Sequence, residues 1–370
     1  MADRSTPATV ARLAGPALAA LVGVALALRP AWPSRPGVAP DLGVYWATAR
    51  AWSPRAALPD PDLVRQAAGG VELGGGFVYP AWTLLPFELL ARLSFAEAVR
   101  VWRGVLVLSI GAAVVGWLVA GQERRWATAG GLAVAAALFH RGVGTGLLQG
   151  NAELVVAGAI GLAAALLRTW PAAAGVALGI AGSIKLWPLV LVGMARRRDL
   201  RLTAAGAAAT AGALLLLDPV LTSTPWGGVL AAWRQLPEDG QRSLAAWVAG
   251  HTPLGGLAAP SVAAACLLPL AWLARREGAT GHAGWPAAVA LGALLAVPRT
   301  LPYAWTLALG PCAVAWATLP AARLGLVAWA VTTGQPVDLQ SMATVAGTLV
   351  GAIWALGRPR GRDGGARSAP

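Results

Sequence analysis

Residues 174–188 read Ala-Gly-Val-Ala-Leu-Gly-Ile-Ala-Gly-Ser-Ile-Lys-Leu-Trp-Pro, and they lie inside an apolar run that extends from Ala172 to Ala195. A run of this length is typical of helices in a bilayer, whose hydrocarbon core takes about 20 apolar residues. A charged side chain within such a run is costly and marks a functional position by default. Lys185 is such a residue, and Pro188 just behind it disfavours a continuous helix.

The composition is that of a membrane protein. Of the 370 residues, 57% are apolar, 46 are Gly and only 12% are charged, against about 25% charged residues in an ordinary soluble domain. A soluble protein of this size cannot hide so much apolar surface, and disordered chains are poor in apolar residues. The apolar runs do not alternate as the strands of a transmembrane barrel do. The sequence therefore predicts an all-α polytopic membrane protein.

The positions of the cationic residues indicate the membrane topology. The chain has 29 Lys and Arg residues, of which Lys185 is the only lysine, and its net charge is +13. Such a charge can indicate nucleic-acid binding, but here the cations gather at the ends of apolar runs, which is the positive-inside pattern. The clusters are Arg124–Arg125, Arg196–Arg198 with Arg201, Arg275–Arg276, and Arg358, Arg360, Arg362 and Arg367. We expect no nucleic-acid partner. The abundance of Arg, Ala, Gly and Pro indicates GC-rich coding, typical of actinobacteria.

The apolar runs predict about twelve transmembrane helices, within a range of about 10 to 13, since each crossing takes about 20 residues. Two regions are ambiguous: 80–93 is short and polar for a span, and 172–198 is either one long helix or a hairpin of two short ones. The other expected spans lie near 10–28, 97–120, 127–147, 152–167, 201–217, 254–273, 283–299, 303–319, 322–334 and 343–357.

The arginine clusters favour one of two topologies. If 80–93 lies along the membrane surface and 172–198 is a hairpin broken at Lys185–Pro188, then Arg124–Arg125 and Arg196–Arg198 both stay cytoplasmic. The same break places Lys185 near the outer face. In the alternative, 80–93 is a span and 172–198 is a single helix. That arrangement exports Arg124–Arg125 and leaves Lys185 in the membrane core. We favour the hairpin, and the alternative stays open.

This topology divides the chain into four parts. Residues 1–217 form a catalytic membrane module that includes a long outer loop, 29–79, which carries juxtamembrane helices. Residues 218–253 form a second outer loop, 254–357 hold the C-terminal transmembrane helices, and 358–370 form a disordered cytoplasmic tail.

Asp41 is the candidate catalytic residue. It lies just beyond the first expected span, and a carboxylate at the membrane surface suits a general base. Tyr45 and Trp46 lie about one turn further on and are candidate substrate-binding residues, because aromatic faces suit sugar rings as well as lipid interfaces. The structural alternative makes Asp41 the N-cap of a helix.

The next outer turn also carries polar side chains. His140-Arg141 precede it, and Gln149-Gly150-Asn151-Ala152-Glu153 follow. An arginine and two amides at one membrane edge suit a phosphate or sugar hydroxyls, so Arg141 is a candidate phosphate ligand, and Gln149 and Asn151 are candidate substrate ligands. The alternative is helix capping.

Lys185 is the sharpest single candidate, because a lysine beside a lipid phosphate would neutralise charge on a leaving group. The alternative is snorkelling to nearby headgroups. Arg299 is a further candidate for the phosphate. Tyr79, His251 and Tyr303 are candidates for the substrate, and simple interfacial turns are the alternative for all four of these residues.

Signatures of soluble enzymes are absent, since the sequence has no P-loop, HExxH, CxxC pair or GxSxG. Cys266 and Cys312 both fall in apolar runs, so we expect small core residues and no disulfide or metal site.

These segments together resemble glycosyltransferase family 87, the bacterial polyprenyl-phosphate-sugar-dependent mannosyltransferases of the GT-C class. The matching pieces are Asp41-Leu42-Gly43-Val44-Tyr45, Phe77-Val78-Tyr79-Pro80, Gln149-Gly150-Asn151, and the glycine-rich helix that runs from Ala174 to Lys185 and Pro188. The order and spacing agree over roughly residues 38–200. Where family members often have Tyr-Pro-Pro, this chain has Tyr79-Pro80-Ala81.

The resemblance implies a function and a site. It implies a GT-C fold in the plasma membrane, with an active site facing outside, where Asp41 is the base and Lys185 lies near the lipid phosphate. It also implies inverting transfer of a sugar, mannose above all, from a polyprenyl phosphate to a glycolipid or glycan acceptor, with an α-linked product. We expect no cofactor beyond this lipid-linked donor, and metal dependence stays open. The alternatives are a transporter or lipid flippase, which predicts internal repeats, and a non-catalytic partner in envelope assembly.

Overall fold

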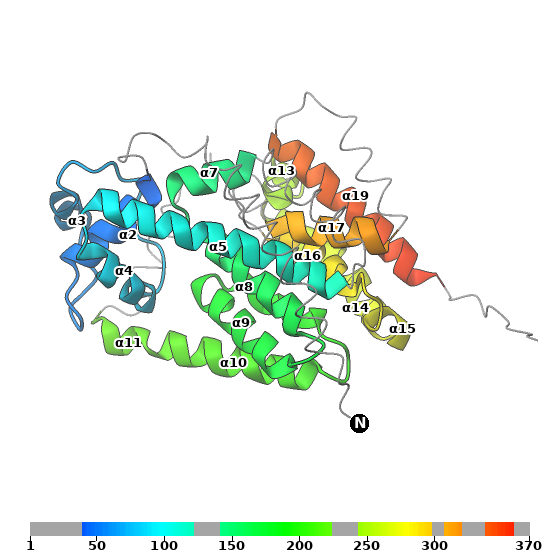
Figure 1. Ribbon diagram of the computed structural model, residues 1–370. Coiled ribbons are helices and arrows are strands. Elements are labelled where there is room, and N and C mark those ends of the chain that lie inside the picture. The colour runs from blue at the N-terminus through cyan, green and yellow to red at the C-terminus, as the bar shows by residue number, and fades with distance from the viewer. Residues whose placement is uncertain (1–38, 122–140, 224–242, 298–306, 320–336, 359–370) are drawn as a thin grey trace, which may run out of the picture.

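A computed structural model describes residues 39–121, 141–223, 243–297, 307–319 and 337–358, and these residues form helices without strands (Figure 1). The N-terminal elements are α2 (Pro40–Ala51), α3 (Pro61–Ala68), η1 (Ala81–Thr83), α4 (Leu84–Ala91), α5 (Phe95–Gly121) and α7 (Arg141–Gln149). The central elements are α8 (Glu153–Leu166), α9 (Pro171–Ile184), η2 (Trp187–Met194), α10 (Leu200–Leu216) and α11 (Asp218–Leu221). The C-terminal elements are α13 (Leu244–His251), η4 (Gly255–Leu257), α14 (Ala258–Ala274), α15 (Glu277–Thr280), α16 (Trp285–Ala296), α17 (Leu309–Thr318) and α19 (Val337–Gly357).

Three stretches of the described chain are long and apolar enough to cross a membrane: Phe95–Gly121, Leu200–Leu221 and Gly255–Ala274. They coincide with three of the expected spans. Other expected spans appear as shorter apolar helices, among them α8, whose 14 residues measure about 21 Å against a hydrocarbon core of about 30 Å. The expected spans 10–28 and 322–334, and most of 127–147, lie outside the described residues. The described part therefore bears out an all-helical membrane protein, and the count of about twelve spans stays a prediction.

Residues 80–93 form two short elements; α4 packs against α2 and α5, and η1 packs against α11. The apolar part, Ala81–Ala91, is too short to cross a bilayer, because 11 helical residues span about 16 Å. The structure thus favours the topology in which this segment is no span. The first loop contains the expected helices, as α2 and α3, and their position beside the membrane stays a prediction.

The chain reverses at Lys185, as the hairpin topology predicts. Helix α9 ends at Ile184, Lys185 has extended backbone angles (φ −138°, ψ 126°), and η2 begins two residues later. Close glycine contacts then fix the direction of the neighbouring helix: a Cβ on Gly175 would lie 2.9 Å from the Ala207 nitrogen, and one on Gly179 would lie 2.7 Å from Cβ of Thr210. Contacts that advance together along both helices mean that α9 and α10 are parallel, so η2 must run back between them. The single-helix alternative for 172–198 is wrong.

A second pair, α5 and α8, packs in the same way. A Cβ on Gly158 would lie 2.9 Å from the Ser109 carbonyl oxygen, and one on Gly161 would lie 2.8 Å from the carbonyl oxygens of Ala112 and Ala113. Small residues allow this backbone approach, which is how helices associate inside membranes. Because these contacts advance in the same direction along both chains, α5 and α8 are parallel as well. In contrast, α8 and α9 are antiparallel neighbours joined by a turn at 167–170.

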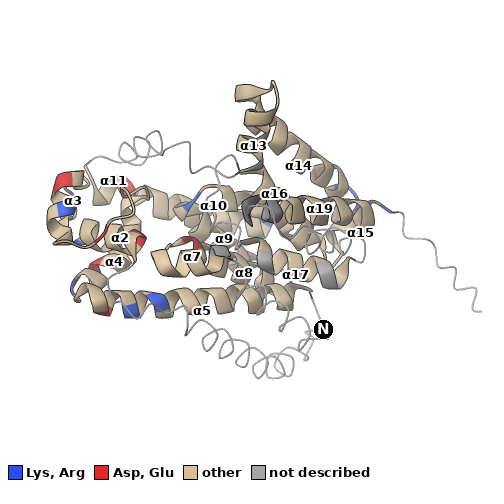
Figure 2. Ribbon diagram, turned by 90° about the horizontal axis from the view of Figure 1, so that it is seen from above, with Lys and Arg blue, Asp and Glu red and all other residues tan. Residues whose placement is uncertain are grey.

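Because of these helix directions, four helix ends lie at the same end of the bundle. The start of α5, the start of α8, the end of α9 and the end of α10 lie at one end of the bundle, which α2, α3, α4 and α11 cover; we call it the capped end (Figure 1). Most acidic residues of the described chain lie there (Figure 2). Arginines lie at both ends (Figure 2); at the opposite end the charge of Arg196 acts on Arg168, and Arg276 donates to the Gly357 carbonyl.

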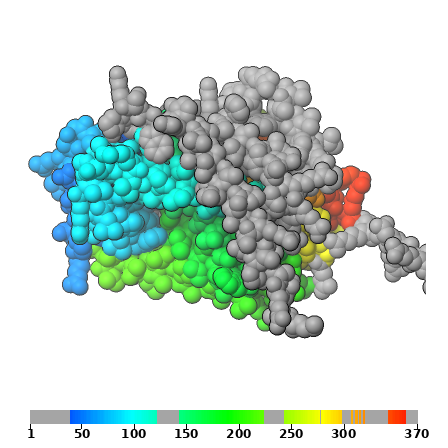
Figure 3. All heavy atoms as spheres, in the orientation of Figure 1, coloured from blue at the N-terminus to red at the C-terminus, as the bar shows by residue number. Residues whose placement is uncertain are grey.

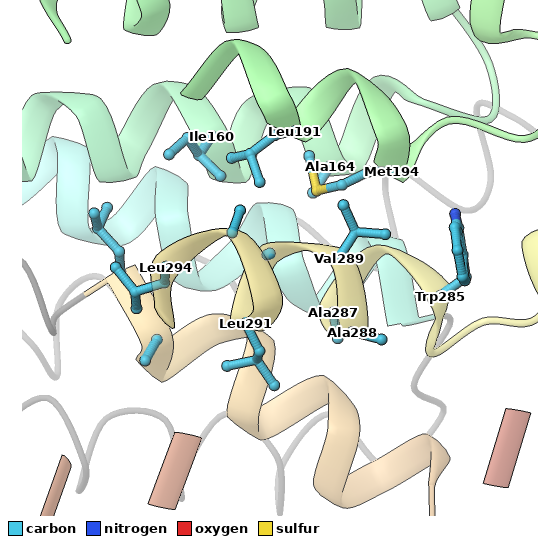
Figure 4. Packing of buried hydrophobic residues seen from close by; sticks show 14 of the residues in the cluster. Ile160, Ala164, Leu191, Met194, Trp285, Ala287, Ala288, Val289, Leu291 and Leu294 are labelled. Carbon is cyan, nitrogen blue, oxygen red and sulfur yellow. The ribbon is translucent and has the colours of Figure 1, made fainter. Parts of the chain in front are cut away.

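The bundle is held together by apolar packing around α16. Leu191 and Met194 of η2 and Ile160 and Ala164 of α8 lie against Val289 of this helix (Figure 4). The Trp285 indole N–H donates to the Gly193 carbonyl at 2.9 Å, which fixes the start of α16 at the end of η2. On the face that Figure 3 shows, α5 and the α8–α10 group make up much of the surface. Leu108, Leu202 and Leu216 are 64%, 56% and 71% exposed, as residues that face lipid would be.

Candidate functional site

Asp41 lies in the first turn of α2, where its carboxylate bonds to the turn between α7 and α8. The N-cap of α2 is Ala39, and no side chain caps this helix, so the interpretation of Asp41 as an N-cap is wrong. Its Oδ2 accepts a hydrogen bond from Nδ2 of Asn151 at 2.5 Å. Gly74 packs against the other oxygen, and a Cβ there would lie 2.6 Å from Oδ1. Burial raises the pKa of Asp41, although the bond from Asn151 and the nearby charge of Lys185 oppose that rise.

Asn151 stands at the turn that leads from α7 into α8. Gly150 has φ +72°, a left-handed conformation that glycine adopts without strain, and its carbonyl accepts a 2.7 Å bond from the Trp102 indole. Asn151 is 2% exposed, and its Oδ1 accepts from the backbone N–H of Glu153 at 2.8 Å. One amide side chain therefore binds the first turn of α8 and Asp41 together. Asn151 therefore contacts the candidate base directly, and its predicted contact with substrate stays a prediction.

Lys185 forms an ion pair with Glu153. The two residues meet because α8 begins and α9 ends at the capped end. The Glu153 side chain is fully buried, whereas that of Lys185 is 22% exposed. An ammonium has three donor hydrogens, so Lys185 keeps donors beyond the one that Glu153 uses.

Glu153 is the site residue that sequence reasoning missed. In the sequence it belongs to the polar turn that precedes α8, and no role of its own is predicted for it. The available signal was its place at the start of one apolar helix, with Lys185 at the end of the next, because an antiparallel helix pair brings those two positions together.

Tyr79 completes the group of polar side chains. It is 7% exposed, and it lies within electrostatic reach of Lys185, Glu153 and Asp41. Burial raises the pKa of its phenol, which is hydrogen-bonded to Tyr45. The two rings make an edge contact, with centroids 5.6 Å apart. Since Tyr45 follows Asp41 by four residues on α2, both lie on the same face of that helix.

A buried carboxylate from another part of the chain, Asp218, binds the backbone of the segment that carries Tyr79. Asp218 is 1% exposed, and its Oδ1 accepts a 2.5 Å hydrogen bond from the backbone N–H of Ala81. The backbone adds two bonds nearby, from Arg55 N–H to the Leu221 carbonyl and from Ser223 N–H to the Ala56 carbonyl. The start of the second loop is thereby joined to the first.

Other predicted residues lie apart from this cluster or cannot be placed in it. The Trp46 indole donates to the Leu93 carbonyl at 3.3 Å and packs on Phe95, so it joins α2 to the start of α5. His251 is exposed on α13, where it stacks on Trp247, and Figures 1 and 2 both place α13 away from α2. Gln149 has a buried Oε1 without a hydrogen-bond partner in the described chain.

The predicted arginine ligands stay predictions. Arg141 begins α7, and its side chain is not among the described ones. Arg299 and Tyr303 lie outside the described residues. In the described part of the chain, no three His, Cys, Asp or Glu side chains gather as a metal site requires.

The arrangement brings two side chains of opposite charge, each suited to a different chemical role, to one end of the bundle. Asp41 is a partly buried carboxylate with an oriented oxygen, which suits removal of a proton from a hydroxyl. Lys185 is a cation, anchored by a buried carboxylate, that can stabilise negative charge developing on a leaving group.

The sequence model of glycosyltransferase family 87 matches residues 77–298, more than half of the chain. The matched region contains Tyr79, Asn151, Glu153 and Lys185, and it begins after Asp41. It also extends well beyond residue 200, where the motif resemblance becomes loose. No curated protein and no solved structure matches the chain. With this match and its apolar helices, the chain belongs to glycosyltransferase family 87 and is a membrane glycosyltransferase.

Proposed function

We propose that this protein is an inverting glycosyltransferase of the GT-C class that works on the outer side of the plasma membrane. It moves a sugar, mannose in the first instance, from a polyprenyl phosphate to a lipid-linked glycan or another envelope acceptor and forms an α-linkage. The observation that carries the proposal is the meeting of Asp41 and Lys185 at the capped end, where Asn151 binds the first and Glu153 binds the second.

The chemistry is a single in-line displacement. The acceptor oxygen attacks the anomeric carbon as Asp41 takes the hydroxyl proton. The bond from that carbon to the phosphate oxygen breaks, and the polyprenyl phosphate leaves with the electron pair. Attack opposite to the leaving group converts a β-linked donor into an α-linked product. General-base catalysis contributes typically about 10²- to 10⁴-fold, and a donor aimed at developing negative charge contributes about 10²- to 10³-fold. Lys185 supplies that donor, with Arg141 or Arg299 as further candidates.

The distribution of charge supports an assignment of the site to one side of the membrane, and the exposed apolar surface supports access for a lipid-linked donor. Described arginines lie at both ends of the bundle, with Arg65, Arg100 and Arg103 at the capped end. The support for an outer position of Asp41 is the consecutive cluster Arg196–Arg198, which follows η2 at the other end and which the positive-inside rule assigns to the cytoplasm. The apolar faces of α10 and α14 border the bundle, with Leu216 and Leu268 71% and 65% exposed. A lipid-linked donor can reach the site from the bilayer, and no nucleotide is needed.

A transporter or flippase is the second candidate, and the position of the charges argues against it. Transport sites lie near the middle of the membrane between repeated halves. Asp41, Glu153 and Lys185 lie instead at helix ends, under a cap made of α2, α3 and α4.

Transfer of labelled mannose from polyprenyl phosphate mannose tests the function. Membranes carrying the wild type should form a labelled glycolipid, and Asp41→Asn should lose at least about 10²-fold in rate, because Asn keeps the hydrogen bond from Asn151 and cannot accept a proton. Glu72→Gln is the matched control, since Glu72 is exposed on the same loop. Polyprenyl phosphate arabinose in parallel identifies the sugar. Full activity of the Asp41 variant would overturn the assignment of the base, and translocation of the lipid without transfer would favour the flippase.

A further inference from the structure

We propose that Glu153 is a positioning residue of this enzyme, whose carboxylate holds the Lys185 ammonium beside Asp41 and so fixes the place of the leaving phosphate. This inference rests on the proposed function. It extends that function to a residue that touches neither the acceptor nor the base.

The geometry starts from a single turn. Asn151 and Ala152 lead directly into Glu153, the first residue of α8, and this turn binds both charged groups: the Asn151 amide donates to Asp41, and the Glu153 carboxylate pairs with Lys185. The Glu153 backbone N–H donates to Asn151 Oδ1 at 2.8 Å, so the two side chains are tied to each other. Any movement of this turn shifts the base and the cation together. The spacing of Asp41 and Lys185 is therefore set by three consecutive residues.

Lys185 needs such an anchor because its own backbone does not hold it. It follows the last residue of α9 in extended conformation, and a lysine side chain has a long flexible stem. A free ammonium at this place would snorkel toward lipid headgroups. Glu153 prevents this, since its side chain is fully buried and the N-terminus of α8 favours a negative charge at that position.

The buried pair serves position more than stability. Desolvation of two charges costs about as much as their attraction returns, so replacing the whole pair by neutral residues is often tolerated, whereas removing one partner leaves an uncompensated charge. One oxygen of Glu153, Oε1, is buried without a hydrogen-bond partner in the described chain. The carboxylate is thus used on the side of Lys185 alone, as expected of a group that places an ammonium.

The pair also sets the electrostatic field at Asp41. The charge that acts on this carboxylate is that of Lys185 at the end of α9, and Tyr79 of the first loop lies within electrostatic reach of Lys185, Glu153 and Asp41 alike. The elements packed on α2 carry further charged residues. Asp62 and Arg65 are paired to each other on exposed α3, and Glu97 is bonded to Ser94 at the start of α5. Glu88 lies on α4, Arg100 and Arg103 lie on α5, and Arg50 of α2 itself lies over the Trp46 ring.

Opposite changes of charge should move the pH profile in opposite directions. Glu153→Gln removes a negative charge and frees the positive one, so the pKa of Asp41 falls and the acid limb of the rate profile moves to lower pH. Lys185→Gln removes the positive charge, so the limb moves to higher pH. A residue with only a structural role would lower the rate without these opposed shifts.

The first arm of the experiment measures transfer by membranes carrying the full chain. We expect Glu153→Gln to lower kcat by about 10- to 100-fold, the cost of losing a supporting partner of a functional group. Glu153→Asp should recover part of the rate and keep the acid limb in place. The double variant Glu153→Gln/Lys185→Gln should be no slower than Lys185→Gln alone, because Glu153 acts through Lys185. It leaves no unpaired charge, so it also controls for failure to fold. Additive losses, or an unshifted limb in Glu153→Gln, would overturn the inference.

The second arm does not depend on transfer. Lys185 is the only lysine, so peptide mass spectrometry can follow its reaction with an amine-acylating reagent at fixed pH. An ammonium held by a carboxylate reacts slowly, because only the neutral amine is a nucleophile, and Glu153→Gln should speed labelling several-fold while Glu72→Gln does not. An unchanged rate would show that Glu153 does not hold the ammonium. If the labelling responds and no donor supports transfer in the wild type, the ion pair stands and the proposed function fails.

Discussion

Nδ2 of Asn151 donates a 2.5 Å hydrogen bond to Oδ2 of Asp41, across 110 positions of sequence. The bond joins helix α2 to the turn that leads into α8, a helix inside the bundle. It therefore fixes the position of the loop that carries the base relative to the helices around Lys185.

Replacement of Asn151 should change both rate and pH dependence. Asn151→Asp sets a second carboxylate against Asp41, and since two like charges at this separation disfavour ionisation, the pKa of Asp41 rises further. We expect the acid limb of transfer to move to higher pH in this variant. Asn151→Ala should instead lower kcat with little change in KM for the acceptor, because only the orientation of the base is lost. Unchanged profiles in both variants would contradict the role of Asn151 in orienting Asp41.

The burial of Asp41 should be visible in the wild-type pH profile. Burial raises the pKa of this carboxyl above its ordinary value of 3.8, and a general base acts only when ionised. Transfer should therefore be lost as pH falls through that raised pKa, at a higher pH than an exposed aspartate would give. The measurement is kcat against pH with saturating donor.

The same shift has a consequence for stability. A carboxyl whose pKa is raised by folding stabilises the folded state at low pH, and this contribution is lost as pH rises through the raised pKa. Asp41→Asn should therefore raise the thermal midpoint in detergent at neutral pH and have little effect below the ordinary pKa. A lower midpoint at neutral pH would mean that ionised Asp41 stabilises the fold.

Much of the topology could be predicted because its signals are local. Pro188, the glycine-rich stretch before Lys185 and the cluster Arg196–Arg198 lie within about one helical span of each other, and together they predicted the reversal that the structure contains. Positions at one end of a bundle follow from such reversals. The sequence could thus place Asp41, Asn151 and Lys185 at one end.

The partners of these residues could not be predicted, because they depend on helix rotation and on distant chain segments. Glu153 and Lys185 lie 32 positions apart, and Asp218 and Ala81 lie 137 apart. A rotation of α8 by one residue, about 100°, would turn Glu153 away from α9. For the same reason Trp46, one position after Tyr45, points to Leu93 and not into the site.

Gly74 offers a test of how closely Asp41 must be held. A Cβ at this position would lie 2.6 Å from Oδ1 of Asp41 and 3.3 Å from the Pro40 carbonyl carbon. Gly74→Ala should therefore displace the carboxylate and lower kcat by at least about tenfold, since small displacements in an active site cost orders of magnitude in rate. Gly76→Ala is the matched control, because a Cβ there meets nothing within 4 Å. Equal rates in the two variants would mean that the carboxylate tolerates displacement.

The last prediction concerns Asp218, which holds the segment of Tyr79 through the backbone of Ala81. Asp218→Ala leaves this buried N–H without its carboxylate acceptor, and an unsatisfied buried polar group costs about 1–3 kcal/mol. We expect a lower thermal midpoint in detergent and a loss of transfer, because Tyr79 is no longer fixed beside Lys185 and Asp41. Asp62→Ala, which removes an exposed partner of Arg65, should change neither quantity. Wild-type transfer by a destabilised Asp218→Ala would show that this carboxylate supports the fold alone, and that the Tyr79 segment keeps its place without it.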